Sequence, residues 1–244
     1  ILVVTREGIP GLDSLIRKIT GDIPEVKSIV LSINRRRDNV ILGDTVRTVY
    51  GSDTLVDRLR HLTFHISPLS FYQVNPVQTV VLYEKAVEFA GLTGSETVFD
   101  LYCGIGTISL FLAERAGKVI GVEIVPEAVD AAIKNAKVNN ITNTEFYCGA
   151  AEEIVPRLYE KGARADVVVV DPPRKGCDAA LLETMVKMQP ERIVYVSCNP
   201  STLARDLKYL TANRYEILEI QPVDLFPWTE HVETVVLMSR KEDK

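Results

Sequence analysis

A cysteine at a predicted strand-to-helix turn is the residue of this sequence best placed to act as a nucleophile. Cys198 follows the apolar run 192–197, which predicts a buried strand. After it, Asn199 is suited to cap a helix, Pro200 fits the first helical turn, and residues 203–210 have helical spacing. The free N–H groups and the dipole at the start of such a helix favour the thiolate. The turn therefore predicts a reactive thiol, although an inert buried cysteine gives the same local pattern.

A glycine-containing loop, Asp100-Leu-Tyr-Cys-Gly-Ile-Gly106, predicts a cofactor site at the end of another strand. Gly104 and Gly106 allow a tight turn and a close approach of the backbone to a ligand. Glu123 ends the next predicted strand, where an acid commonly accepts hydrogen bonds from ribose hydroxyls. A nicotinamide dinucleotide would require a third glycine, which G-I-G-T-I-S lacks. The acidic Asp100 suits the cationic amino-acid end of S-adenosylmethionine better than a phosphate, so S-adenosylmethionine is the predicted cofactor.

Two acidic residues are expected beside the thiol. Asp171 opens the segment Asp171-Pro-Pro-Arg-Lys-Gly176 at the end of a strand and would neighbour Cys198 if the two strands are adjacent. In methyltransferases that act on amino groups an aromatic residue typically follows the two prolines; Arg174 stands there, and it and Lys175 are suited to contacting phosphates. Glu233 begins an apolar strand, where burial would raise its pKa and make it a candidate base, unless it is simply a solvated acid.

A thiolate, a methyl donor and a base suit one reaction well. Carbon 5 of uracil is a poor nucleophile until a thiolate adds to carbon 6 and turns the ring into an enolate. Carbon 5 can then accept a methyl group, after which a base removes its proton and the thiol leaves. The target base must be flipped out of its stack to reach such a site.

The predicted elements place these residues in an α/β fold. From Pro76 onward helices and strands alternate, and two strands without an intervening helix end the pattern. The predicted strands are 97–102, 118–123, 145–148, 166–171, 192–197, 215–225 and 231–239, and the predicted helices include 76–90, 105–116 and 126–139. This order predicts a seven-stranded, doubly wound, Rossmann-like sheet with one antiparallel strand, the architecture of S-adenosylmethionine-dependent methyltransferases.

The first 70 residues predict part of a small α+β domain, and residues 71–244 the methyltransferase domain. A strand is expected over 1–6, a helix over 11–20, and a hairpin formed by 26–34 and 38–50 that turns on Arg35, Arg36 and Arg37. These arginines, with Arg58, Arg60 and His61, could hold phosphates, although a solvated turn explains them equally well.

Composition limits the remaining possibilities. No stretch approaches the roughly 18 apolar residues of a membrane span, and four scattered cysteines without a C-x-x-C pair argue against a metal site or disulfides and for the reducing cytoplasm. The net charge of −5 argues mildly against strong nucleic-acid binding. The chain starts inside a predicted strand without Met, so we expect a fragment of a longer protein, with a monomer as the default state.

Five motifs then occur in the order typical of one family. They are Phe71-Tyr-Gln-Val-Asn-Pro76, Asp100-Leu-Tyr-Cys-Gly-Ile-Gly106, Asp171-Pro-Pro-Arg-Lys-Gly176, Ser197-Cys-Asn-Pro200, and Val223-Asp-Leu-Phe-Pro227 with His231-Val-Glu233. With these motifs, residues 26–240 resemble the RNA uracil-5 methyltransferase family, whose members modify bacterial 23S rRNA or tRNA. The resemblance implies Cys198 as nucleophile and Glu233 as base. It also implies that S-adenosylmethionine and the target are surrounded by Gln73, Tyr102, Glu123 and Asp171.

Three features depart from the family pattern. Trp228 stands where relatives often have His, and Thr107 where some have Asn. The family's N-terminal RNA-binding β-barrel and iron–sulfur cysteines are missing, so we expect no cluster and weakened RNA binding in this chain. The hairpin segments 29–34 and 39–43 look closer to the 23S rRNA branch than to the tRNA branch. A tRNA uracil-5 methyltransferase, an RNA cytosine-5 methyltransferase and a non-catalytic RNA-binding module stay open as alternatives.

Overall fold

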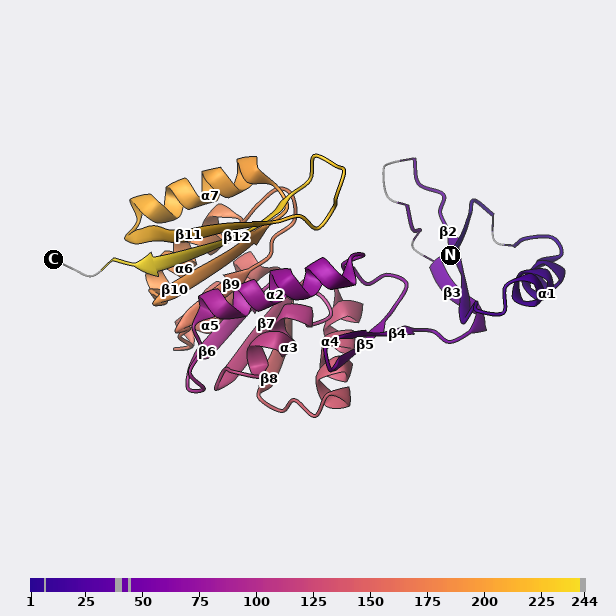
Figure 1. Cartoon of the computed structure of the whole chain (residues 1–244), viewed down its shortest axis with the longest axis horizontal. Coiled ribbons are helices and arrows are strands. Elements are labelled where there is room, and N and C mark those ends of the chain that lie inside the picture. Colours follow the sequence, from indigo (N-terminus) through magenta and orange to yellow (C-terminus); the bar gives the residue numbers. More distant parts are fainter. Residues whose placement is uncertain (7, 38–40, 44, 242–244) are drawn as a thin grey trace. The chain divides into compact units, whose positions relative to one another are not determined.

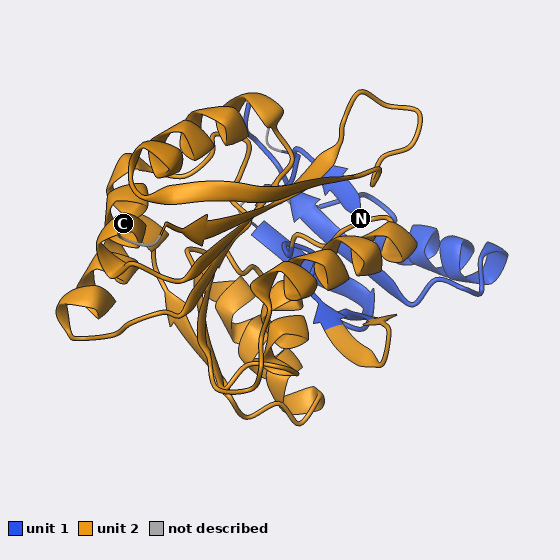
Figure 2. Cartoon of the chain, turned by 60° about the vertical axis from the view of Figure 1, so that its left-hand side comes forward, with its two compact units in different colours: residues 1–57, 65–70 blue, residues 58–64, 71–244 orange. Residues whose placement is uncertain are grey.

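The structure, a computed structural model, describes residues 1–6, 8–37, 41–43 and 45–241. It contains two compact units: residues 1–57 with 65–70, and residues 58–64 with 71–244 (Figure 2). The predicted division at residue 70 differs from this only in segment 58–64, which groups with the larger unit. The candidate catalytic and cofactor-binding residues, together with Arg174 and Lys175, lie in the larger unit, whereas Arg35, Arg36 and Arg37 belong to the smaller one.

The smaller unit contains a three-stranded sheet and one helix. Its elements are β1 (Leu2–Val4), α1 (Leu12–Asp22), β2 (Ser28–Ile33) and β3 (Thr45–Gly51). β2 is the central strand; it pairs parallel to β1 and antiparallel to β3. The predicted strand and helix are present, and β2 and β3 form a hairpin, but its second strand begins at Thr45, later than predicted, because residues 41–43 are not in a strand. Residues 38–40 and 44 of the predicted second strand lie outside the described residues.

A short hairpin that the sequence analysis did not predict follows. β4 (Leu55–Leu59) and β5 (Leu62–Ile66) pair with each other and turn at Arg60, whose φ is 55°. Arg60 forms ion pairs with Glu84 at 3.3 Å and Glu114 at 3.8 Å, and His61 also pairs with Glu114. Arg60 and His61, both considered above as phosphate ligands, are therefore already paired with acidic side chains.

The larger unit is built around the predicted seven-stranded sheet (Figure 1). Its strands are β6 (Thr97–Leu101), β7 (Lys118–Glu123), β8 (Thr144–Cys148), β9 (Val167–Val170), β10 (Arg192–Ser197), β11 (Tyr215–Val223) and β12 (Glu233–Arg240). Its helices are α2 (Pro76–Ala90), α3 (Thr107–Ala113), α4 (Pro126–Val138), α5 (Ala151–Glu160), α6 (Ala179–Met188) and α7 (Pro200–Ala212). The order β11-β12-β10-β9-β6-β7-β8, in which β12 runs antiparallel to both of its neighbours, confirms the predicted architecture.

Local sequence explains where the helices begin. Asn75 accepts a hydrogen bond from the Gln78 amide at 3.1 Å before α2, and Asn199 accepts one from the Ser201 amide at 3.0 Å before α7. A proline occupies the first position of each of these helices, where no intrahelical N–H is needed. The cap and the proline together fix the start of α7 immediately after Cys198.

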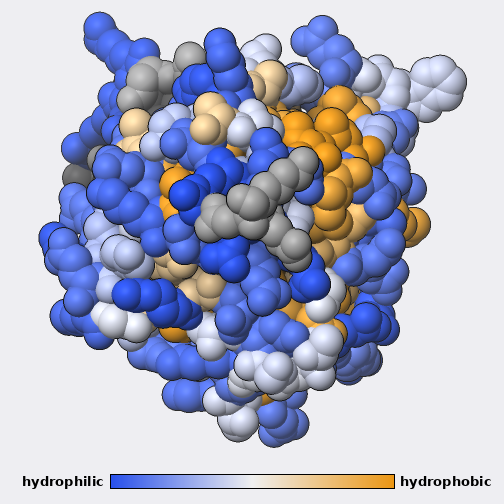
Figure 3. All heavy atoms as spheres, turned by 90° about the vertical axis from the view of Figure 1, so that its left-hand side faces the viewer, coloured by the Kyte–Doolittle hydropathy of each residue, from blue (hydrophilic) through white to orange (hydrophobic). Residues whose placement is uncertain are grey.

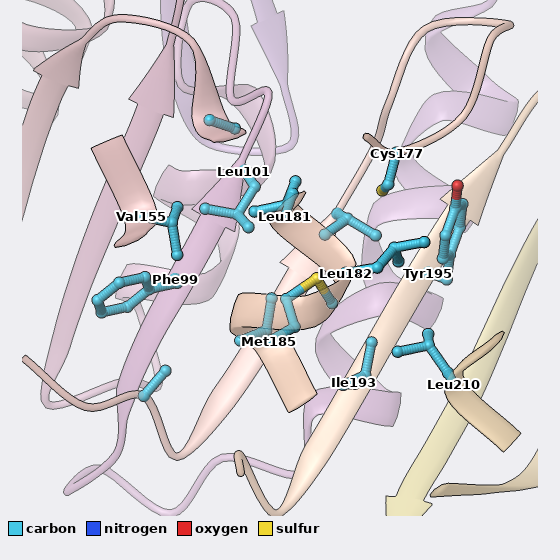
Figure 4. Packing of buried hydrophobic residues seen from close by; sticks show 14 of the residues in the cluster. Phe99, Leu101, Val155, Cys177, Leu181, Leu182, Met185, Ile193, Tyr195 and Leu210 are labelled. Atoms are coloured by element: carbon cyan, nitrogen blue, oxygen red, sulfur yellow. The ribbon is translucent and has the colours of Figure 1, made fainter. Parts of the chain in front are cut away.

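Apolar side chains from both sheet and helices form the core of the larger unit. Figure 4 shows part of it: Phe99 and Leu101 of β6 lie on one side of Met185 of α6, and Ile193 and Tyr195 of β10 lie on the other. β9, with four consecutive buried valines, is the most apolar strand and separates β6 from β10. Burial of both faces is typical of a parallel sheet covered by helices. The core therefore holds the strands whose carboxyl ends carry the candidate site.

One face carries mainly hydrophilic side chains around a smaller apolar area (Figure 3). No helix among the described residues is long and apolar enough to cross a membrane.

Candidate active site

Cys198 and Glu233 meet through the register of two paired strands. β10 and β12 are antiparallel, with Ser197 opposite Thr234, so the residues one step further along, Cys198 and Glu233, face each other at the same end of the sheet. β9 is the other neighbour of β10, and Asp171 follows its last residue. Asp171 and Cys198 were predicted to be neighbours if their strands are adjacent, and β9 and β10 are indeed paired. A thiol and two carboxyl groups therefore share one end of three neighbouring strands.

Burial raises the pKa of both carboxyl groups. Glu233, only 4% exposed, has its pKa raised to about 7, first by burial and then by the charge of Asp171, with Arg174 acting in the opposite direction. Burial likewise raises the pKa of Asp171 to about 6. The predicted raised pKa of Glu233 is confirmed, and the alternative of a solvated acid is wrong. A carboxylate with a pKa near neutrality is suited to accept a proton.

The pKa of Cys198 differs from the sequence expectation. Burial, followed by the charges of Glu233 and Asp171, raises the pKa of the half-buried thiol and outweighs its own backbone hydrogen bond and the charge of Arg174. The helix start predicted from sequence is present, but the two carboxylates oppose it. Additional positive charge near Cys198 would favour its thiolate.

The glycine loop has the open backbone that a ligand site requires. Gly104 and Gly106 have φ values of 56° and 81°, and a Cβ atom at Gly104 would meet nothing within 4 Å. Tyr102, φ 66°, is half-buried at the start of the loop, where its amide and that of Cys103 donate to the Val122 carbonyl at 2.9 and 3.0 Å. The backbone thus leaves β6 in a strained turn that faces open space.

Glu123 fixes this loop from the neighbouring strand. Its carboxylate accepts hydrogen bonds from the Gly104 amide at 3.0 Å and the Val125 amide at 2.9 Å. Glu123 is half-buried, and each oxygen retains a second lone pair for a ribose hydroxyl. Thr107 donates to the Tyr83 hydroxyl at 3.2 Å and so is directed toward α2.

Asp100 supplies the most direct indication of a cationic ligand. It is fully buried, and one carboxyl oxygen accepts from the Ser109 hydroxyl while the other, Oδ1, has no hydrogen-bond partner. Burial, followed by the charges of Asp171 and Glu123, raises its pKa to about 7. An unpaired buried carboxylate oxygen in β6, the strand that leads into the glycine loop, suits a positively charged group such as the amino-acid end of S-adenosylmethionine. No group of three or more His, Cys, Asp or Glu among the described residues is arranged to hold a metal ion.

The other predicted residues occupy two different environments. Gln73 is buried two positions before the cap of α2, and Asn75 joins this segment to the loop after β11 by donating to the Leu225 carbonyl at 3.1 Å. Arg174 and Lys175 are exposed, and the charge of Arg174 reaches both Cys198 and Glu233. Gln73 therefore faces the interior, while the two cations remain accessible to a large anionic partner.

Helix α7 holds the loop that carries Arg174 through a set of hydrogen bonds that we term the α7 latch: Asn199, Thr202, Arg205 and Asp206. Asn199 Nδ2 and Thr202 Oγ1 donate to the Arg174 carbonyl at 3.2 and 3.1 Å, and Arg205 Nη2 donates to the Lys175 carbonyl at 2.9 Å. The latch fixes the loop that begins at Asp171 to the helix that begins after Cys198.

Asp206 is the buried centre of the latch. Its Oδ2 accepts from the Cys177 amide at 2.8 Å and from the Tyr195 hydroxyl at 2.7 Å, and its Oδ1 accepts from Arg205 Nε at 2.8 Å. Figure 4 shows Cys177 beside the hydroxyl end of Tyr195. The sequence analysis missed the latch, although spacings of three and four residues after Cys198 place these polar side chains on one helical face.

Comparison with known proteins identifies similar sequences. A model of the family described as tRNA (uracil-5-)-methyltransferase matches residues 28–241. An uncharacterized RNA methyltransferase of Bacillus cereus is 56% identical over 243 residues, which are 99% of this chain and 53% of the relative. One of Caldanaerobacter subterraneus is 53% identical over 240 residues, covering 98% and 53%. This chain thus spans about half the length of these relatives.

Comparison with solved structures also identifies similar methyltransferases. The tRNA (uracil-54, C5)-methyltransferase of Pyrococcus abyssi, solved in complex with S-adenosyl-L-homocysteine, superposes with a TM-score of 0.79 and 35% identity, covering 96% of this chain and 55% of that one. Trm5b of the same organism has a TM-score of 0.68 at 17% identity over 99% and 72% of the two chains, which supports the fold alone.

Replacing Gly176 with Ala should break the α7 latch. Gly176 has φ 76°, and a Cβ there would lie 2.5 Å from Arg205 Nη2 and 2.6 Å from Asp206 Oδ2. We expect Gly176→Ala to lower the free energy of unfolding by at least about 1 kcal/mol more than Gly162→Ala, because charged hydrogen bonds must also yield. Gly162 has φ 92°, but a Cβ atom there would meet nothing within 4 Å, so its replacement isolates backbone strain. Urea denaturation measures both, and equal losses would contradict this role.

Asp100→Asn should flatten the pH dependence of stability. The folded protein binds the Asp100 proton more tightly than the unfolded chain, so this residue's stabilising contribution is present at low pH and is lost as the pH rises from about 4 through about 7. We expect the fall in unfolding free energy between pH 4.5 and 7.5 to be at least about 1 kcal/mol smaller in the variant. Asp130→Asn, on an exposed position of α4, is the control. Parallel curves for wild type and Asp100→Asn would contradict the prediction.

Proposed function

Because this chain belongs to the tRNA (uracil-5-)-methyltransferase family, we propose that it methylates carbon 5 of a uridine in RNA with S-adenosylmethionine as the methyl donor. The observation that carries this proposal is the strand register that places Cys198 opposite the buried Glu233, with Asp171 on the other side of the thiol. A nucleophile and a base on adjacent strands suit addition to a pyrimidine followed by removal of its carbon-5 proton.

We assign the cofactor site to the ends of β6, β7 and β9. Gly104 provides backbone that a ligand can approach, Gly106 adopts the positive φ that the loop requires, and Asp100 provides an unpaired carboxylate oxygen for a cationic group. Glu123 is suited to the ribose. Tyr102, Gln73 and Asp171 complete the proposed set, Gln73 from the family resemblance. S-adenosylmethionine, when bound, supplies an electrophilic methyl group and a positive charge.

Cys198 and Glu233 perform the remaining steps of the proposed mechanism. The Cys198 thiolate adds to carbon 6, forming an S–C6 bond and an enolate that makes carbon 5 nucleophilic. After carbon 5 has gained its methyl group, the Glu233 carboxylate removes the carbon-5 proton. The electron pair of that C–H bond re-forms the C5–C6 double bond, and the S–C6 bond breaks to return the thiolate. A base with a pKa of about 7 is deprotonated often enough at neutral pH to take part.

We propose large-subunit 23S rRNA as the substrate class, with Arg174 and Lys175 as contacts to its phosphates and Asp171 beside the target base. The support is the resemblance of the front hairpin, 29–34 and 39–43, to the rRNA branch; residues 39 and 40 lie outside the described part. A tRNA substrate is the second candidate, since the 35% identical Pyrococcus abyssi enzyme acts on tRNA uracil 54. We further propose a monomer acting in the cytoplasm, in accord with four free cysteines.

Cys198→Ala should abolish both turnover and adduct formation. The full-length protein would be given S-adenosylmethionine and separate 23S rRNA and tRNA transcripts labelled with tritium at uridine carbon 5. Release of tritium to water should occur with one transcript and fall to background in Cys198→Ala, because no thiolate can activate carbon 5. Cys148→Ala, which removes an exposed cysteine, is the matched control. Methyl incorporation without tritium release would exclude uracil-5 chemistry, and no reaction despite S-adenosylmethionine binding would favour a binding module.

Glu233→Gln should separate addition from proton removal. Loss of a general base typically slows proton transfer by about 10²–10⁴-fold, so we expect tritium release to fall by at least about 100-fold while the covalent adduct with ordinary RNA accumulates. Denaturing gels measure the adduct, and 5-fluorouridine RNA, which has no carbon-5 proton, should trap wild type and variant to the same extent. Equal loss of adduct and of tritium release in Glu233→Gln would rule out the assigned role.

A further inference from the structure

The most exposed large apolar side chain among the described residues is the single tryptophan of the sequence. Trp228 is fully solvent-exposed, at 104%. Its φ is 68°, a left-handed conformation that is uncommon for a bulky residue and costs on the order of 1–3 kcal/mol. A strained and fully exposed indole has no packing role in this structure, so its position calls for an external partner.

Trp228 is displayed by a loop that begins and ends beside the proposed base. The last residue of β11, Val223, pairs with Glu233, the first residue of β12, so the loop 224–232 leaves and re-enters the sheet at the Glu233 position. Leu225 anchors its start, being 1% exposed and bonded through its carbonyl to Asn75. The loop therefore extends from the same end of the sheet that carries Cys198.

Internal hydrogen bonds order the tip of this loop. The Thr229 amide and hydroxyl donate to the Phe226 carbonyl at 3.2 and 2.7 Å, and the His231 amide donates to Thr229 Oγ1 at 3.2 Å. The rings of Phe226 and His231 contact edge to face at a centroid distance of 6.4 Å. Trp228 thus lies in a closed turn of residues 226–229, and its exposure follows from that turn.

The surroundings of Trp228 favour a nucleic-acid base over other partners. A protein partner needs a contiguous apolar surface, but Thr229, Glu230 and His231 follow the indole directly and are exposed. The loop 224–232 contains Asp224 and Glu230 and no Lys or Arg, which disfavours contact with phosphates. The flat indole face remains as its means of binding, and bases stack on such faces regardless of their identity.

We propose that Trp228 stacks on an unpaired base next to the target uridine in the RNA substrate. This inference rests on the proposed function, since flipping the target base exposes the faces of its neighbours. Stacking there would hold the opened strand in the site and contribute to RNA affinity. It would leave the chemical steps at Cys198 and Glu233 unchanged.

Kinetics of adduct formation test this proposal. With 5-fluorouridine RNA and the full-length protein, Trp228→Ala should raise the RNA concentration for half-maximal adduct formation about 5- to 100-fold without changing the maximal rate. Trp228→Phe, which keeps an aromatic face, should restore most of the affinity. Leu218→Ala, at an exposed position of β11, should have no effect. An unchanged half-maximal concentration in Trp228→Ala would overturn the proposal.

A substrate with one missing base identifies the contact. We would prepare two RNAs, one with an abasic residue immediately 5′ of the target and one with it immediately 3′. One of the two should bind the wild type more weakly than intact RNA does, but should not further weaken RNA binding by Trp228→Ala. Additive losses with both RNAs would overturn base stacking. The fluorescence of Trp228 is the difference between wild type and Trp228→Phe, and it should be quenched when the adduct forms. If this fluorescence is already shielded from solvent without RNA, protein covers the indole, which also overturns the proposal. If wild type forms no adduct with any uridine RNA, the proposed function itself fails.

Discussion

The structure depends on the burial of several carboxyl groups at one end of a single sheet. Three strands carry these groups: β6 contains Asp100, β9 is followed by Asp171, and β12 begins with Glu233. Burial disfavours the charge of each carboxyl group and so raises its pKa. Asp171 also raises the pKa of the other two through repulsion. Such a cluster opposes folding at neutral pH, so it has to be explained by what it binds. A cationic ligand relieves both the repulsion and the unpaired oxygen of Asp100.

The same charges connect the proposed cofactor site to Cys198, the proposed nucleophile. Glu233 and Asp171 raise the pKa of Cys198, whereas Arg174 lowers it. Positive charge placed among these carboxylates therefore also favours the thiolate. The α7 latch ties the backbone of Arg174 to the helix that begins after Cys198, because Asn199 and Thr202 both donate to the Arg174 carbonyl.

Strong local signals allowed much of the fold to be predicted. Asn–Pro caps and apolar runs fix the limits of α2 and β10 as predicted, and the absence of a helix between β11 and β12 indicated the antiparallel strand. Hairpin β4–β5 was missed because most of β4 is exposed and gives no alternating pattern. The candidate residues were found from motifs, but the raised pKa of Cys198 depends on charges from two other strands. The register of neighbouring strands brings these charges together, and the sequence of a single segment does not specify that register.

The position of β12 has a consequence for how the protein is made. β12 carries Glu233 and follows the other strands of the sheet in chain order, yet it inserts between β10 and β11. During synthesis Cys198 and the glycine loop emerge first, and β10 has no β12 to pair with until β12 leaves the ribosome. Under the proposed mechanism, a nascent chain that stops short of β12 has a thiol but no base to release a captured uridine. Under that mechanism, the order of the strands along the chain would delay turnover until the sheet is closed.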